Sequence, residues 1–302
     1  MPTNVKENGF ESSIVSWLVQ HNGYEQGSNA DYNKEIAMDE TRLFRFLNTT
    51  QADKMKQLRL ENDPLEKEKF LQRLDQSLHT NGVIDLLRKG FRYKHLVLDM
   101  FYVRPSPGNE TAAKLYAQNI FSVTRQLQYS RQNPLLALDV CLFLNGLPIA
   151  TMELKNQLTK QNAADAVKQY KDERTPDEVL FGFKRCIVHF AVDDNEVRMC
   201  TELKGQKSWF LPFNKGYNDG AGNPPNPDGI KTDYLWKEIL RKDDFSNIIE
   251  NYVQIICDED EETHKKSYKQ IFPRYHQLQL VTSLLADAKR DGVGKRYLIQ
   301  HS

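Results

Sequence analysis

The sequence feature that most constrains the fold is a pair of apolar runs joined by Asn145-Gly146. The first run reads LLALDVCLFL and the second reads LPIATMEL; both are short and rich in branched apolar side chains, which favours strands. Asn-Gly between two such runs is a strong short-range signal for a β-hairpin. We therefore expect an antiparallel hairpin in the middle of the chain.

Other periodic segments predict an α/β arrangement around this hairpin. Strand patterns occur at 95–103, 120–128 and 296–302, and a second hairpin is expected at 185–203, turning at Asp194-Asn195. Helical spacing occurs at 10–21, 64–81, 162–174, 234–252 and 274–290. This mixture predicts an α/β fold built on a central sheet.

One helix start has a clear capping signal. Asp63 is expected to cap the helix at 64–81, with Pro64 at the first helical position. Glu66 stands three residues after Asp63, so we expect it to complete a capping box.

The composition limits how the chain can meet nucleic acid or a membrane. Among 302 residues, 41 are basic and 41 acidic, so there is no overall positive field and any contact with DNA must be local. No apolar run approaches the ~20 residues of a membrane helix, and the polar start lacks the apolar core of a signal peptide, which favours the cytoplasm. The 4 cysteines show no metal-binding spacing, so we expect them to be reduced and mostly buried.

The length predicts more than one structural unit. A chain of 302 residues exceeds the size at which a single core usually stops growing, so we expect one substantial domain and a smaller piece. The segment 204–233 holds most of the turn-forming residues. A loop of this length is either functional or a domain boundary.

Three polar side chains on the central hairpin have the composition of a hydrolytic site. Asp139 lies inside an otherwise apolar strand, where an ionised carboxylate is costly unless it is paired, hydrogen-bonded or bound to a metal. Glu153 and Lys155 are two residues apart, so they lie on one face of the second strand. A regular two-residue turn would set Asp139 opposite Met152. We therefore expect an irregular turn or a β-bulge that brings Asp139 and Glu153 together.

Two carboxylates with a backbone carbonyl suit Mg²⁺, which prefers oxygen ligands. An adjacent lysine ammonium completes a set suited to phosphodiester hydrolysis. Gln169 and Tyr170 on the following helix are candidate helpers. The candidates for contacts with DNA phosphates are Arg125, Lys160, Lys168 and Arg174.

A structural interpretation of the same residues stays open at this point. A Glu-x-Lys pair on a strand is usually a surface ion pair, and an isolated strand aspartate often bonds to a nearby turn. His189 and His276 are isolated, so we expect them to be core or surface residues without a chemical role.

The text around the hairpin adds a specific resemblance. The run LDVCLFLNGLPIATMELKN resembles the nuclease motif of the restriction (R) subunit of type I restriction-modification enzymes, members of the PD-(D/E)xK nuclease superfamily. The resemblance extends to NIFSVTRQLQYS, DAVKQYKDER and WFLPFNKGYNDGAGNPPN, so it covers most of the chain. It implies a restriction-endonuclease-like core, a central mixed sheet flanked by helices, that cleaves double-stranded DNA together with methylation and specificity subunits.

Carried over residue by residue, this resemblance makes Asp139 and Glu153 the metal ligands, with the carbonyl of Leu154 as a third, and Lys155 the catalytic lysine. It also suggests Glu11 as an accessory acid, although an acid near a helix start is equally favoured by the helix dipole. The family often carries a Gln-x-x-x-Tyr motif on the next helix. Here Tyr170 directly follows Gln169, and Glu173 stands where the tyrosine is expected, which leaves the helper roles open.

A second resemblance lies near the C-terminus. FPRYHQLQLV resembles the adenine-contacting motif that precedes a helicase-type ATPase core, with Gln277 as the base contact. KRYLIQHS resembles the strand before a phosphate-binding loop, but the chain contains no GxxxxGK[ST]. The resemblance therefore implies the N-terminal part of a longer subunit in which ATP drives DNA translocation, and no ATP hydrolysis by this chain.

We accordingly expect an endonuclease domain at 1–245, followed at 246–302 by a linker and the incomplete start of a RecA-like helicase domain. Two alternatives remain: a repair or junction-type nuclease of the same superfamily, and a non-catalytic DNA-binding or assembly module.

Overall fold

A mixed sheet forms the centre of the protein. The computed structural model describes residues 4–156, 160–260, 263–292 and 294–299, and within them the largest sheet has the strand order β1-β6-β7-β8-β9-β10-β11. Its strands are β1 (Glu25–Gln26), β6 (Phe121–Gln128), β7 (Ala137–Leu144), β8 (Leu147–Leu154), β9 (Val188–Val192), β10 (Val197–Cys200) and β11 (Leu211–Pro212). Neighbouring strands are antiparallel except at β1–β6 and β8–β9, which are parallel. The predicted α/β class with a central mixed sheet is confirmed.

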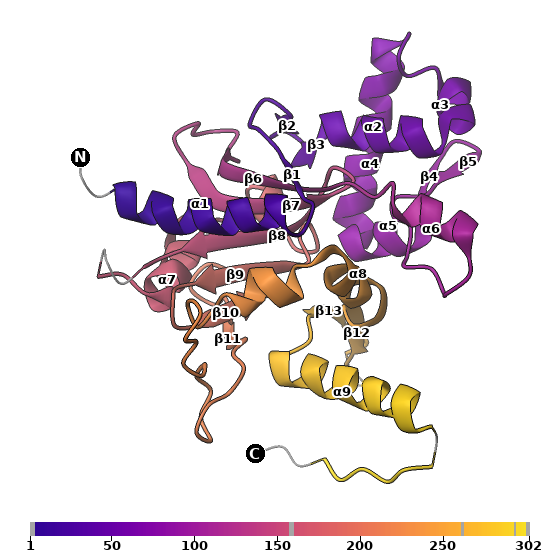
Figure 1. The fold of residues 1–302 in the computed structure, drawn as a ribbon. Coiled ribbons are helices and arrows are strands. Elements are labelled where there is room, and N and C mark those ends of the chain that lie inside the picture. Colours follow the sequence, from indigo (N-terminus) through magenta and orange to yellow (C-terminus); the bar gives the residue numbers. More distant parts are fainter. Residues whose placement is uncertain (1–3, 157–159, 261–262, 293, 300–302) are drawn as a thin grey trace.

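Helices cover both faces of this sheet (Figure 1). On one face α1 (Asn4–Gln20) buries Ile14 and Leu18 against β7 and β8 residues such as Leu142. On the other face α7 (Ala163–Glu173) buries Ala166 and Tyr170 in a separate cluster with Cys141. The side chains of β7 and β8 are divided between two apolar cores, one on each face of the sheet. Both strands are therefore almost entirely buried.

A group of helices and small β-hairpins lies beyond one end of the sheet (Figure 1). It consists of β2 (Tyr32–Asn33), β3 (Met38–Asp39), α2 (Glu40–Thr50), α3 (Ala52–Leu58), α4 (Pro64–Asn81), α5 (Val83–Lys89), β4 (Phe91–Tyr93), β5 (Leu96–Leu98) and α6 (Glu110–Tyr116). Asp63 caps α4 by accepting a bond from the Glu66 N–H at 3.0 Å, as predicted. The expected capping box is wrong, because the Glu66 carboxylate instead accepts a hydrogen bond from Tyr93 at 2.7 Å and pairs with Lys94.

The strand expected at 95–103 is much shorter than its apolar pattern suggests. Only Leu96–Leu98 is a strand. Beyond it, the backbone of Tyr102 bonds to the side chain of Asn119 through both its N–H and its carbonyl. Side chains therefore satisfy main-chain groups that a longer strand would have paired with a neighbouring strand.

The C-terminal part packs on the same core as the sheet. It contains a π-helix η3 (Leu235–Ile239), α8 (Lys242–Asn251), β12 (Gln254–Glu259), β13 (Lys266–Ile271) and α9 (Tyr275–Asp291). Earlier in the chain, a 3-10 turn η2 (Val179–Phe181) precedes β9 and packs in the same cluster as α7. α8 runs across residue 245 and buries Phe245, Ile248 and Ile249 in the core of the sheet. The boundary expected at 245 stays a prediction, and the packing shows no break there.

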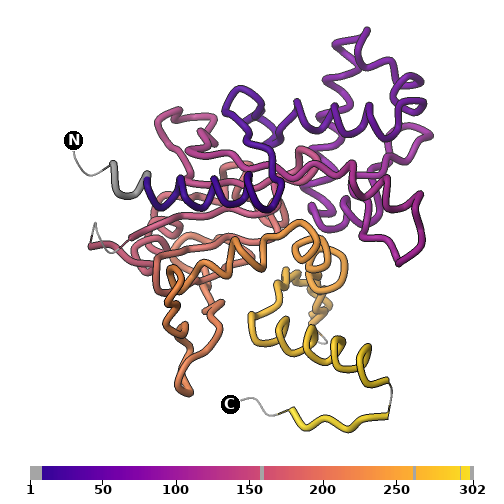
Figure 2. The backbone as a smooth tube through the Cα atoms, in the orientation of Figure 1, coloured from indigo at the N-terminus to yellow at the C-terminus, as the bar shows by residue number. Residues whose placement is uncertain are grey.

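After β10 the long segment 204–233 adds the short strand β11 to the edge of the sheet and otherwise runs outside it as far as η3 (Figure 2). The expected strand at 296–302 is wrong for residues 296–299, which pair with no described strand; residues 300–302 lie outside the described part. Cys141, Cys186 and Cys200 are buried free thiols and Cys257 is an exposed one, as expected. None of the helices in the described ranges combines the length and apolar composition needed to cross a membrane.

The central hairpin contains the irregularity that its polar residues required. Asn145 and Gly146 have positive φ angles of 51° and 82° and form a two-residue turn, with Leu144 paired to Leu147. The pairing then shifts between Leu142 and Phe143, where Ile149 is the extra residue of a β-bulge.

Beyond the bulge Val140 pairs with Met152, a register that sets Asp139 opposite Glu153. The prediction of a bulge is confirmed.

Gly146 is required by its surroundings as well as by its backbone angle. A Cβ atom at this position would lie 2.4 Å from the carbonyl oxygen of Asp39 and 2.7 Å from Leu43. The close approach allows the Asp39 N–H to donate to the Gly146 carbonyl at 2.9 Å. The turn is therefore held against the start of α2, and the register of the hairpin is held with it.

Candidate metal and catalytic centre on the β7–β8 hairpin

Asp139 is held in place from both neighbouring strands. Its Oδ2 accepts a hydrogen bond from the Leu154 N–H at 2.7 Å, and its Oδ1 accepts one from Gln126 Nε2 at 3.2 Å. The first bond crosses the hairpin from β7 to β8, next to Glu153. Asp139 is only half-buried, so its carboxylate is both oriented by the sheet and open to a ligand.

Glu153 is fully buried and only partly satisfied. Its Oε1 accepts a hydrogen bond from Arg174 Nε at 2.6 Å, whereas its Oε2 has no hydrogen-bond partner among the described residues. Burial, and next the charge of Asp139, raise the pKa of Glu153 to about 8, against the opposing effect of Arg174 and Lys155. A buried carboxylate oxygen without a donor is costly unless a cation meets it.

Arg174 lies inside the protein and not on its surface. It is 2% exposed, and Nη1 donates to the Tyr129 hydroxyl at 3.0 Å while Nη2 donates to the Ala137 carbonyl at 2.9 Å. Together with the bond to Glu153, these contacts engage every nitrogen of the guanidinium group. The expected contact of Arg174 with a DNA phosphate is therefore wrong for this arrangement.

Lys155 and the Leu154 carbonyl complete the predicted set. Lys155 is half-buried at the end of β8, two residues after Glu153, and its positive charge lowers the pKa of that glutamate. Its N–H donates to the Val192 carbonyl at 2.8 Å, which fixes this backbone to β9. The N–H and C=O of one strand residue point to the same side, so the Leu154 carbonyl lies toward β7, as its N–H does.

Glu11 belongs to a second network, joined to Asp139 through Gln126. The buried Glu11 carboxylate accepts bonds from Arg125 Nε at 2.6 Å and from Gln126 Nε2 at 2.8 Å. The Gln126 amide therefore lies between Glu11 and Asp139. Sequence reasoning missed Gln126 because its role depends on a left-handed backbone angle inside β6, with φ of 46°, which no local pattern signals.

The two candidates on α7 have different environments. The Tyr170 hydroxyl bonds to the Thr151 hydroxyl at 2.8 Å, and Thr151 in turn bonds to His189 Nδ1 at 2.7 Å. The Oε1 of Gln169 is buried, and no described residue gives it a hydrogen bond. Tyr170 is therefore bonded within the core to Thr151, which stands two residues before Glu153 on β8. His189 is also a core residue, and burial lowers its pKa to about 3.

The other predicted residues are spread over the surface. Lys160 and Lys168 are exposed near α7, and Arg125 is engaged with Glu11. Gln277 is exposed on α9, where its Oε1 accepts a bond from the Arg274 N–H at 3.1 Å as part of a capping box. The structure therefore gathers Asp139, Glu153 and Lys155 and leaves these residues outside the centre.

The chemistry of the donor set fits a hard cation. Within the described residues no group of three or more His, Cys, Asp or Glu side chains is arranged to hold a metal. The hairpin offers two carboxylates and one backbone carbonyl, and the unpartnered Oε2 of Glu153 is the atom that most requires a positive charge. Mg²⁺ binds through one or two carboxylates and keeps several waters, so this small set is sufficient for it.

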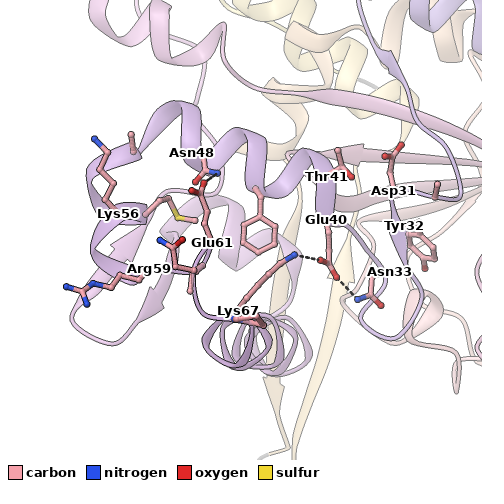
Figure 3. Close-up of a pocket in the computed structure, with 17 residues that line it drawn as sticks. Asp31, Tyr32, Asn33, Glu40, Thr41, Asn48, Lys56, Arg59, Glu61 and Lys67 are labelled. Carbon is pink, nitrogen blue, oxygen red and sulfur yellow. Dashed lines mark hydrogen bonds and ion pairs between the residues drawn. The ribbon is translucent and has the colours of Figure 1, made fainter.

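A cavity lies elsewhere in the protein, and its polar groups are paired with one another, unlike Oε2 of Glu153. It has a volume of about 940 Å³ between the β2–β3 segment and the helices α2 to α4 (Figure 3). Its polar groups pair with one another: Glu40 binds Lys67 at 3.3 Å and Asn33 at 2.5 Å, and the Lys67 ammonium lies over the Phe44 ring. None of the three hairpin residues lines it, so cavity size alone does not identify the chemical centre.

A comparison with protein families identifies the family of the part of the chain that contains the hairpin. The model of the family described as Type I restriction enzyme R protein N terminus matches residues 4–208. This range contains the whole sheet up to β10, together with α1, the central hairpin and α7. No curated protein matches the chain.

Proposed function

The chain belongs to the family of type I restriction enzyme R protein N termini, and from this premise we propose that it is a Mg²⁺-dependent endonuclease domain with a PD-(D/E)xK core. The observation that carries the proposal is the buried Oε2 of Glu153, which has no partner in the part of the chain that the structure describes; Glu153 lies across the hairpin from Asp139. Most buried polar atoms are paired within a protein, so an unpaired carboxylate oxygen beside Asp139 supports a metal-binding role for Glu153.

Asp139, Glu153 and the Leu154 carbonyl would hold the cation. When bound there, Mg²⁺ would polarise the phosphodiester and acidify a bound water. The Lys155 ammonium orients the attacking water and offsets negative charge that builds on the phosphate as the water oxygen bonds to phosphorus and the P–O bond to the leaving oxygen breaks. Lys160 lies just before α7 and Lys168 lies on it. Both side chains are exposed, so their positive charges would attract the phosphates of the DNA backbone.

In the full subunit this domain would cut double-stranded DNA when ATP-driven translocation stalls, with methylation and specificity subunits as partners, in the cytoplasm. These parts of the proposal rest on the family. Gln277 at the start of α9 would belong to the nucleotide site of the motor.

A nicking assay on supercoiled plasmid DNA tests the proposal. We expect Mg²⁺-dependent nicking by the wild type, stopped by a chelator and reduced at least about 100-fold in Asp139→Ala and Lys155→Ala. Lys289→Ala on the exposed face of α9 is the matched control and should nick like the wild type.

Equal residual activity in all four proteins would contradict the assigned centre. DNA binding with no nicking at any Mg²⁺ or Mn²⁺ concentration would favour the non-catalytic binding module.

A further inference from the structure

The contacts of Arg174 have an unusual distribution. A guanidinium facing a carboxylate can form two parallel hydrogen bonds, one to each oxygen. Here only Nε reaches Glu153, at 2.6 Å from Oε1, and the other two nitrogens are bound to Tyr129 and Ala137. The arginine therefore compensates the charge of Glu153 and leaves Oε2 uncovered.

The position of Arg174 is determined by three segments of the chain. It follows directly after α7, whose last residue is Glu173, and it reaches the end of β8, the start of β7 and Tyr129 beyond β6. Tyr129 is itself fixed, because it is 1% exposed and its ring packs edge-on against Phe181. The guanidinium thus cannot rotate to take both oxygens of Glu153 without breaking bonds to Tyr129 and Ala137.

We infer that Arg174, held by Tyr129 and the Ala137 carbonyl, is a positioning residue that keeps Glu153 as a one-oxygen ligand and presents Oε2 to the divalent cation. The inference rests on the proposed function and adds to it the residue that orients the buried ligand. Groups that orient metal ligands through hydrogen bonds typically change metal affinity about 10–100-fold when they are removed.

Charge and geometry make different predictions for Arg174 variants. If the arginine acted by charge alone, Arg174→Lys would bind the metal as tightly as the wild type. A lysine ammonium is a compact point charge without the planar set of donors, so it cannot hold Glu153, Tyr129 and Ala137 in one plane. Positioning therefore predicts that Arg174→Lys and Arg174→Met both bind the metal more weakly than the wild type.

The test is a titration of the whole chain with Mn²⁺ alone, in which free Mn²⁺ is measured by electron paramagnetic resonance, with circular dichroism to check folding. We expect Mn²⁺ affinity to fall about 10–100-fold in Arg174→Lys and Arg174→Met. Tyr129→Phe keeps the aromatic packing and removes one anchor of the guanidinium, and should weaken binding about 5-fold. The control is Arg185→Lys, a change at another buried arginine that pairs with Asp75, and it should bind Mn²⁺ like the wild type.

The outcomes separate the inference from the proposed function. Wild-type affinity in both Arg174→Lys and Tyr129→Phe would overturn the positioning role and leave the nuclease proposal standing. A wild type that binds no Mn²⁺ would overturn the proposed function and the inference with it. If the Arg174 variants fail to fold, Tyr129→Phe decides alone, since loss of affinity supports the role and unchanged affinity overturns it.

Discussion

Two arginine–glutamate pairs are joined to the sheet in the same way, yet they differ in one atom. In each pair the arginine Nε lies 2.6 Å from a buried carboxylate oxygen: Arg125 binds Glu11 of α1, and Arg174 binds Glu153 of β8. The second oxygen of Glu11 accepts a bond from Gln126, whereas the second oxygen of Glu153 has no partner within the described ranges.

On this difference we base the proposal that Glu11 has a structural role and Glu153 a metal-binding one. A buried carboxylate with both oxygens bound gains its stability from the protein alone. A buried carboxylate with one unbound oxygen is only partly compensated by the protein, and a bound cation would supply the missing partner. Glu11 thus ties α1 to β6, and Glu153 is the residue through which the protein would bind a cation.

The largest expected effect is on DNA nicking. If variants of Glu153 and of Glu11 lost nicking equally, the comparison between the two pairs would fail. Glu153→Gln removes a metal ligand and should lower Mg²⁺-dependent nicking at least about 100-fold, because even indirect partners of metal ligands contribute 10–100-fold. Glu11→Gln should lower it less than about tenfold. Rates of plasmid nicking at saturating Mg²⁺ measure both effects, and an equal loss would make Glu11 a member of the centre.

The next effect is on stability and concerns the two arginines. Arg174→Met leaves Glu153 buried without a counter-charge and should lower the free energy of unfolding by about 3 kcal/mol. The Arg125 side chain is 32% exposed, so solvent screens its pair and Arg125→Met should cost about 1 kcal/mol. Urea denaturation measures both. The double variant Arg174→Met/Glu153→Gln should recover part of the loss, and no recovery would mean that Arg174 acts mainly through packing.

A smaller effect tests whether the polar chain from α7 belongs to the same centre. Tyr170→Phe removes the bond to Thr151 and should cost about 1 kcal/mol of stability. Mg²⁺-dependent nicking should stay within about twofold of the wild type, because this hydroxyl bonds to Thr151 in the core. A tenfold loss of nicking in a stably folded Tyr170→Phe would place the tyrosine in the chemistry.

The smallest effect is the pH dependence that His189 gives to folding. Burial lowers the pKa of His189 from 6.5 to about 3, so the unfolded chain binds a proton that the folded protein does not bind between these values. This contribution to stability is complete above pH 6.5 and is lost as the pH falls. Between pH 7 and pH 6 the free energy of unfolding should fall by about 0.7 kcal/mol through this residue. Urea midpoints of the wild type and His189→Gln should differ in pH slope, and parallel slopes would contradict it.

The sequence predicted the parts of the structure that depend on local pattern. The hairpin at Asn145-Gly146, the helix after Asn162 and the facing of Asp139 and Glu153 through a bulge follow from turn chemistry, capping and the two-residue period of strands. The side chains that complete the centre were missed or misassigned. Arg174 has the sequence context of an exposed phosphate contact at a helix end, and only the packing of three segments shows that it is buried.

Gln126 shows the same limit for the backbone. Its amide joins Glu11 and Asp139 because its φ is positive inside a strand, and neighbouring sheet contacts determine that angle. The strand expected over 95–103 failed for a related reason, since the side chain of Asn119 satisfies the backbone of Tyr102 from 17 residues away. Long-range hydrogen bonds of this kind have no local signature.

The most direct test of the central claim is a crystal structure of the protein soaked with Mn²⁺, with the ion located by anomalous scattering. We predict an ion bound to Glu153 Oε2 and to the Asp139 carboxylate at distances of about 2.1 Å, with Glu11 still bound to Arg125 and Gln126. An ion bound at Glu11, or a fully occupied ion elsewhere with none at the β7–β8 hairpin, would contradict the account.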